Sequence, residues 1–125
     1  MRFERVPFEV SAELLDQPWV WANPAGDVMT AGVGDYRVTD PVSLTQWSLT
    51  PAALRFGYEP VSTGVYRSRG HVKARRAAAA EAHLVIDSIE GRETARPNDW
   101  IVTDTDGNSW VVESQWFAAR YRAVD

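Results

Sequence analysis

Two aspartates at matching places in similar segments are the first residues that could carry chemistry. Asp35 lies in TAGVGDYRVTD, residues 30–40, and Asp99 lies in TARPNDWIVTD, residues 94–104. Each carboxylate stands between a turn and an aromatic-containing strand, where it could act as a general base or anchor a ligand. A carboxylate in this place can equally accept hydrogen bonds from the backbone N–H groups of the turn and hold the entry of the hairpin. Both interpretations stay open, and both aspartates are candidate binding residues.

Tryptophan is the second feature, because a chain of 125 residues carries 6 of them. Trp19 and Trp21 are two residues apart, which places both side chains on one face of a strand. Such a pair could stack a base or bind a protein partner. The alternative is a core layer between two halves of the molecule, so Trp19 and Trp21 are also candidates only.

A basic cluster between residues 67 and 76 is the third feature. Side chains at the alternating positions 67, 69, 71 and 73 would project from one face of an extended strand, where they could contact phosphates or an acidic protein. A solvated strand face, or a match for the acidic first half of the chain, explains the cluster equally well. The net charge of −4 disfavours nonspecific nucleic-acid binding, which depends on neutralising phosphates. The cluster consists of Arg67, Arg69, His71, Lys73, Arg75 and Arg76.

Other chemistry has little support in the sequence. There is no cysteine, and His71 and His83 have no metal-ligand spacing between them. Nucleophile-elbow, P-loop and dinucleotide-binding motifs are absent as well. We therefore predict no catalytic residue, no metal site and no cofactor. The N-terminus does not resemble a signal peptide, and no run approaches the ~20 apolar residues of a membrane span, so we expect a cytoplasmic protein without a membrane partner.

An internal repeat shows how the chain would position these residues. At an offset of 64, six of eleven positions in residues 30–40 are identical to residues 94–104. An aromatic pair, Tyr36 and Trp100, joins them, and at an offset of 63 the apolar register continues from Trp47 and Trp110 to Val61 and Val124. The hydrophobic content of 45% suits one globular domain, whereas a lone 60-residue unit would bury little surface. We predict a single domain, 1–125, with copy one at 1–62, a linker at 61–70 and copy two at 66–125.

The local signals indicate a strand-rich α+β fold. In each copy we expect a strand, a short helix, a second strand, a two-stranded hairpin, a second helix and an extended tail that contains a tyrosine. The first helix is predicted over Ala12–Asp16, capped by Ser11, and again at the Ala77–Ala80 run. The second is predicted over Pro51–Gly57, capped by Thr50, and over Gln115–Tyr121, capped by Ser114. This β-α-β-β-β-α unit would pack with its copy about a pseudo-twofold axis and share one core.

The second copy resembles a group of small uncharacterised bacterial and phage proteins. These carry a Pro-Gly-Asp-Trp/Tyr turn followed by a strand, a glycine turn, another strand and a helix with a Phe and a Tyr. The resemblance covers about residues 72–124, and 25–61 more weakly. It departs at Asn98, where the pattern has glycine, and at Val33, where it has proline. The resemblance implies an architecture and a mobile-element origin, but no activity.

Three functions remain open from the sequence. The first is a non-enzymatic interaction module, such as an accessory or inhibitory factor, which binds a protein partner through the region of Trp19 and Trp21. The second is a small-molecule or nucleotide binder, or an enzyme, with a site between the copies near Asp35 and Asp99. The third is nucleic-acid binding through residues 67–76, with an affinity that falls steeply with salt. The sequence favours the first, and it leaves the oligomeric state undetermined.

Overall fold

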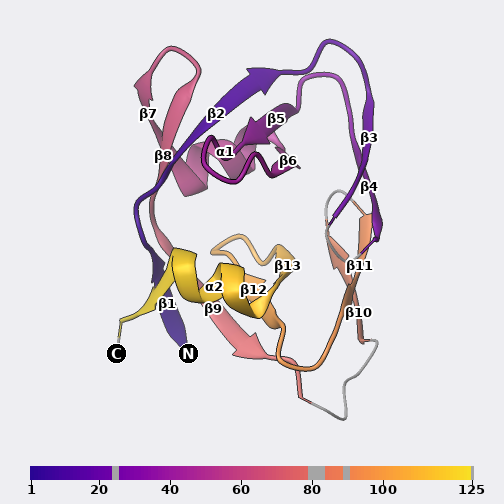
Figure 1. The fold of residues 1–125 in the computed structure, drawn as a ribbon, viewed down its shortest axis with the longest axis vertical. Coiled ribbons are helices and arrows are strands. Elements are labelled where there is room, and N and C mark those ends of the chain that lie inside the picture. The colour runs from indigo at the N-terminus through magenta and orange to yellow at the C-terminus, as the bar shows by residue number, and fades with distance from the viewer. Residues whose placement is uncertain (24–25, 79–83, 89–90, 125) are drawn as a thin grey trace. The chain divides into compact units, whose positions relative to one another are not determined.

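The computed structural model describes residues 1–23, 26–78, 84–88 and 91–124. Within these ranges the protein is an α+β fold rich in strands, with two short helices (Figure 1). No described helix has the length and apolar character needed to cross a membrane. The chain divides into two compact units, which we call the continuous unit, Pro7–Gly70, and the split unit, Met1–Val6 with His71–Asp125.

The continuous unit is built on an antiparallel five-stranded sheet of order β6-β5-β2-β8-β7. A separate ribbon of two strands, β3 and β4, and one helix, α1, complete it. Its elements are β2 (Glu9–Leu14), β3 (Trp19–Ala22), β4 (Val28–Ala31), β5 (Tyr36–Thr39), β6 (Gln46–Leu49), α1 (Pro51–Gly57), β7 (Tyr58–Ser62) and β8 (Val65–Ser68).

The split unit has a five-stranded antiparallel sheet of order β13-β12-β9-β1-β14. The N-terminal strand β1 is its fourth strand, so the first residues of the chain complete a sheet whose other strands come from the second half. Its elements are β1 (Arg2–Arg5), β9 (His71–Arg76), β10 (Leu84–Ser88), β11 (Gly91–Ala95), β12 (Trp100–Thr103), β13 (Ser109–Val112), α2 (Ser114–Arg120) and β14 (Tyr121–Ala123).

The two sheets have the same order when strands are matched by position, and their hairpins share one register. In β5–β6, Arg37 lies opposite Ser48 and Val38 opposite Trp47. In β12–β13, residues 101 and 102 lie opposite 111 and 110 in the same way. Positions related by this register are called equivalent below. The pairing β1–β9 and β1–β14 is equivalent to β8–β2 and β8–β7.

The predicted second helices are confirmed, and so are the two hairpins that precede them. Helix α1 begins at Pro51, and the Thr50 hydroxyl accepts a hydrogen bond from the backbone N–H of Ala53 at 3.1 Å. Helix α2 begins at Ser114, so the predicted cap at Ser114 is wrong. The cap position is Glu113, whose side chain makes no cap hydrogen bond.

The predicted first helix is wrong in the continuous unit. Residues 9–14 form β2, where Val10 and Ala12 turn towards the hydrophobic cluster and the strand pairs with β5 on one edge and β8 on the other. Two ladders of backbone hydrogen bonds outweigh the high helix propensity of Ala12 and Leu14. The second copy of this prediction fails where it can be compared, because Arg75 and Arg76 end β9 and 77–78 are not helical. Residues 79–83 lie outside the described residues.

Residues 61–70 were expected to be a linker, but they hold regular structure. They contain the end of β7, a turn at Thr63–Gly64 and all of β8. Strands β4 and β11 are also additional to the prediction, and each pairs with the strand before it.

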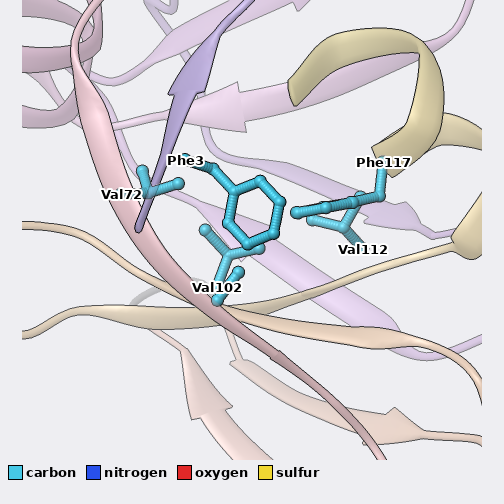
Figure 2. Close-up of a cluster of buried hydrophobic side chains, with 6 residues drawn as sticks. Phe3, Val72, Val102, Val112 and Phe117 are labelled. Atoms are coloured by element: carbon cyan, nitrogen blue, oxygen red, sulfur yellow. The ribbon is translucent and has the colours of Figure 1, made fainter. Parts of the chain in front are cut away.

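Buried hydrophobic residues form three clusters, and the described members of each come from one unit, whereas the sequence predicts one shared core. One belongs to the split unit, where Phe3 of β1 packs edge-to-face on Trp100 and Phe117 with ring centroids 5.3 and 4.9 Å apart. Figure 2 shows Phe3 beside Phe117 in this cluster. Val72, Val102 and Val112 point into the same cluster. The equivalent cluster of the continuous unit contains Val10, Val38, Leu54 and Tyr58, and a smaller one in the split unit contains Ala77, Ala95 and Ile101.

Candidate binding groove

The paired tryptophans lie on the β3–β4 ribbon of the continuous unit. Trp19 is opposite Ala31 and Trp21 is opposite Met29, so these four side chains share one face of the ribbon. Met29 and Ala31 are buried, and both indoles are partly buried. The indole rings stack with centroids 5.6 Å apart and planes 22° apart. The sequence prediction that both tryptophans face one side of a strand is therefore confirmed.

Polar groups of the main sheet fix these rings. The Trp21 Nε1–H donates to the Ser48 hydroxyl at 2.9 Å, and Ser48 is only 3% exposed. The Arg37 guanidinium lies 4.5 Å from the centre of the Trp19 ring, within the range of a cation–π contact. Arg37 also donates from Nη1 to Glu13 at 2.9 Å, while its buried Nε has no hydrogen-bond partner. The aromatic pair is thus held against β5 and β6 by an arginine and a serine.

An open groove of about 340 Å³ runs beside the tryptophans. The ribbon forms one side, and the turn between β5 and β6 forms the other. None of the seven lining residues carries a formal charge, so the groove offers apolar surface, aromatic rings and neutral hydrogen-bonding groups. The lining residues are Trp19, Trp21, Ala22, Asn23, Leu44, Thr45 and Gln46.

The β5–β6 turn holds Leu44 out at the rim of the groove. The side chain of Leu44 is 72% exposed, and its backbone is left-handed, with φ of 62°. This conformation disfavours a residue with a Cβ by about 1 kcal/mol or more. Asp40 stabilises the turn, because its buried carboxylate accepts from the backbone N–H of Val42 at 2.8 Å. Val42 itself is 90% exposed, so the turn presents two apolar side chains to solvent.

The split unit has aliphatic residues at the equivalent positions. Leu84 and Ile86 stand where the continuous unit has Trp19 and Trp21, since Leu84 lies opposite Ala95 as Trp19 lies opposite Ala31. Ile101 replaces Arg37 and Val111 replaces Ser48, and both pack with Ile86 in the small cluster. The same strand order and register thus occur with aliphatic residues at these positions, so the fold does not require the tryptophan, arginine and serine.

The β5–β6 and β12–β13 turns also differ, because the turn of the continuous unit is the more apolar one. In the split unit the turn after β12 is polar, with Asp104 accepting from the backbone N–H groups of Asp106 and Asn108 at 2.9 and 3.0 Å. Gly107 supplies its left-handed residue, with φ of 84°. The continuous unit instead places an exposed leucine at a left-handed position. Both departures from the plainer unit meet at the groove.

Asp35 and Asp99 are not among the groove-lining residues, and each accepts a hydrogen bond within its own turn. Asp35 Oδ2 accepts from the backbone N–H of Gly32 at 2.9 Å, and Asp99 Oδ2 accepts from that of Arg96 at 3.0 Å. The two turns are alike, with left-handed residues at Gly34 and Asn98. These bonds are the ones that the structural interpretation of both aspartates predicts.

The basic cluster is divided between the units, so the prediction of one extended strand is wrong. Strand β8 ends at Ser68, and β9 begins at His71 after Gly70, whose φ is 92°. Arg67 and Arg69 belong to the continuous unit and contact Glu59, at 3.9 and 4.0 Å. Lys73, Arg75 and Arg76 lie on β9, where the Arg76 guanidinium is 5.1 Å from the centre of the Trp100 ring.

No group of three or more histidine or carboxylate side chains among the described residues could hold a metal ion. His71 is an exposed residue of β9, with Nε2 4.0 Å from Glu4. His83 lies outside the described residues.

Sequence reasoning missed Arg37, Leu44 and Ser48. The repeat held a usable signal, because each of Arg37 and Ser48 aligns with an aliphatic residue of the other copy. Leu44 had none, since its left-handed backbone is not visible in its residue type.

No protein-family model matches the chain, and neither a curated protein nor a solved structure matches it significantly.

Proposed function

We propose that the protein is a non-enzymatic binding module whose continuous unit holds an apolar segment of a protein partner in the Trp19–Trp21 groove. The observation that carries the proposal is the convergence at the groove of the features that set the continuous unit apart from the split one. The exposed Leu44 adopts a disfavoured backbone conformation that costs stability, and the paired tryptophans have no counterpart in the split unit. Exposed aromatic and aliphatic side chains around a concavity are typical of sites that bind proteins.

The chemistry of the groove favours a peptide over a nucleotide. Its lining carries no cation to balance a phosphate, and Arg37, which lies against the Trp19 ring, already pairs with Glu13. Arg67, from the basic cluster, is paired with Glu9 and Glu59. Neutral groups such as the Gln46 amide suit the backbone of an extended segment, and the indoles suit its apolar side chains.

The same proposal includes the origin of the fold. We attribute the shared sheet order and hairpin register to a tandem duplication, in which the second copy kept a plain core and the first acquired the groove. The left-handed Asn98 stands where the bacterial and phage pattern has glycine, which supports kinship with that group. A cytoplasmic accessory or inhibitory factor of mobile-element origin is the role that this kinship suggests.

Leu44→Gly tests the function without threatening the fold, because glycine adopts a φ of 62° freely. Asn98→Gly is the matched control, since it relieves a φ of 74° in the split unit, which contributes none of the described groove residues. Random twelve-residue peptides displayed on phage would be selected on the immobilised wild-type protein, and the enriched peptide titrated by fluorescence anisotropy. Loss of one leucine contact should weaken binding about tenfold in Leu44→Gly, and Asn98→Gly should bind as the wild type does.

Two outcomes would sink the proposal. One is equal affinity of the enriched peptide for the wild type and Leu44→Gly. The other is failure to enrich any peptide while nucleoside triphosphates quench the tryptophan fluorescence, which would favour the nucleotide alternative.

A further inference from the structure

Strands β1 and β8 hold equivalent places in their sheets. Strand β1 lies between β9 and β14, and β8 lies between β2 and β7. Each inserts one aromatic side chain, Phe3 or Tyr66, towards the hydrophobic cluster of its unit. The next residue, Glu4 or Arg67, therefore points to the opposite face of the sheet.

These two residues carry opposite charges, and so do their neighbours. Glu4 lies opposite Arg122 of β14 and His71 of β9. Arg122 donates from Nε to Glu4 at 2.6 Å, and the His71 imidazole lies 4.0 Å away. The continuous unit has the reverse arrangement, in which a basic residue is central and acidic residues lie on both sides of it.

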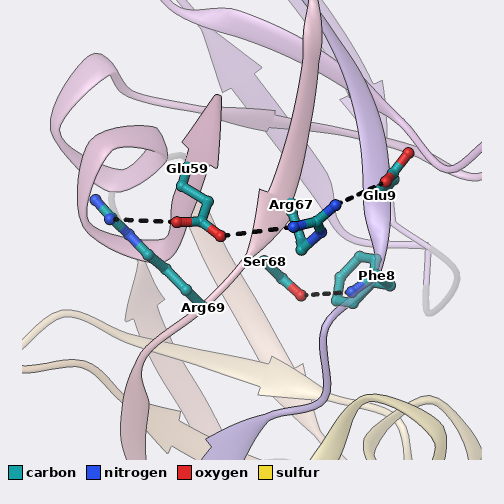
Figure 3. A network of polar contacts seen from close by, with 6 residues as sticks. All are labelled: Phe8, Glu9, Glu59, Arg67, Ser68 and Arg69. Carbon is teal, nitrogen blue, oxygen red and sulfur yellow. Dashed lines mark hydrogen bonds and ion pairs between the residues drawn. The ribbon is translucent and has the colours of Figure 1, made fainter. Parts of the chain in front are cut away.

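Figure 3 shows that central residue, Arg67, between two glutamates. Arg67 lies opposite Glu9 of β2 and Glu59 of β7, at distances of 3.3 and 3.9 Å. Beside this charged row, the Ser68 hydroxyl accepts from the backbone N–H of Phe8 at 3.0 Å, which fixes β8 against the start of β2.

Chain connectivity alone does not assign the strands to these sheets. Strand β1 is followed directly by β2, and β8 is followed directly by β9, so each could fold back as a hairpin on its neighbour. In that exchanged pairing, Glu4 would lie between Glu9 and Glu59, and Arg67 would lie between His71 and Arg122. Glu4 would then face two carboxylates and Arg67 would face the guanidinium of Arg122, and like charges directly opposed in a sheet are destabilising.

We propose that Glu4 and Arg67 sort the two strands between the two sheets. The gap between β9 and β14 is a recognition site for an extended segment with a carboxylate next to its buried aromatic residue, and the N-terminus of the chain fills it. The gap between β2 and β7 selects a basic segment in the same way. Partly exposed ion pairs add little stability one by one. The selection comes from the difference between attraction in one pairing and repulsion in the other.

Charge reversal in the full-length chain tests the sorting. Glu4→Arg and Arg122→Glu should each lower the ratio of folded to unfolded split unit about tenfold, and the double variant should recover most of the loss. Urea unfolding would give the ratio, and hydrogen exchange of peptides from β9 and β14 would locate the change. The control is Asp87→Arg, which breaks a cross-strand pair with Arg92 at 3.1 Å in which both side chains are 80% exposed, and it should change the ratio less than twofold.

A second variant tests assignment directly. Glu4→Arg combined with Arg67→Glu gives each strand the charge that suits the other sheet. Nuclear Overhauser contacts between β1 and β14 are expected to be lost, or the chain to unfold at markedly lower urea. Native contacts at wild-type stability, or a charge-swapped Glu4–Arg122 pair that recovers nothing, would overturn the proposal.

Discussion

Phe3→Ala should destabilise a part of the protein that begins almost seventy residues further along the chain. Phe3 is the third residue, yet it is only 6% exposed and packs on Trp100 and Phe117. Truncating a buried phenylalanine costs about 3–5 kcal/mol, through lost burial and the cavity that remains. Because small domains are stable by about 5–15 kcal/mol, this loss would remove much of the stability of the split unit.

The assay should separate the two units. Hydrogen exchange read by mass spectrometry during a urea titration would report β9, β12 and β13 independently of β2 and β5. Phe3→Ala should release protection in the split unit at low urea and leave the continuous unit close to the wild type. Phe56→Ala is the matched control, because the side chain of Phe56 in α1 is 57% exposed, and its loss should cost less than about 0.5 kcal/mol.

Two results would refute this reasoning. Unchanged protection of β9 in Phe3→Ala would mean that β1 is not an integral strand of the split unit. Loss of protection in residues 7–70 with β9 intact would assign Phe3 to the other core.

The remaining predictions concern single hydrogen bonds. Thr50→Ala should lower the free energy of unfolding by about 1 kcal/mol, because it removes the cap of α1, whereas Ser114→Ala should change it little; urea unfolding measures both. A double-mutant cycle of Trp21→Phe and Ser48→Ala should give a coupling of about 0.5–1.5 kcal/mol, since the indole N–H donates to that hydroxyl, and additive effects would contradict the bond. Asp104→Ala should cost about 1–2 kcal/mol and raise hydrogen exchange at 105–108, because two backbone N–H groups lose their acceptor; unchanged exchange there would count against it.

The success of the sequence predictions follows the range of the interactions behind them. The hairpins and second helices were predictable because their signals are local. Asp106–Gly107 forms a turn by its own chemistry, and Thr50 followed by Pro51 begins a helix without outside help. The helix predicted over Ala12–Asp16 failed because partners distant in sequence, β5 and β8, decide the conformation there.

The candidate site was predictable only in part, for a similar reason. The spacing of Trp19 and Trp21 was enough to place them on one face of a strand. Their surroundings depend on Arg37 and Ser48, which lie on the five-stranded sheet, whereas the tryptophans lie on the two-stranded ribbon. The left-handed Leu44 depends on a turn organised by the buried carboxylate of Asp40.

By itself, therefore, the sequence determined the alternation of strands, the turns, the helix starts and the repeated hairpin, because each depends on residues within a few positions of one another. Only the tertiary structure decided that β1 completes the split unit, that the basic cluster is divided between two sheets, and that the tryptophans border an uncharged groove. Strand pairing joins residues far apart in the chain, and the alternation of residues in one strand does not predict which strand pairs with it. In our proposal the opposite charges of Glu4 and Arg67 encode the assignment of β1 and β8 to their sheets. Their role can be recognised only once the neighbouring strands are known.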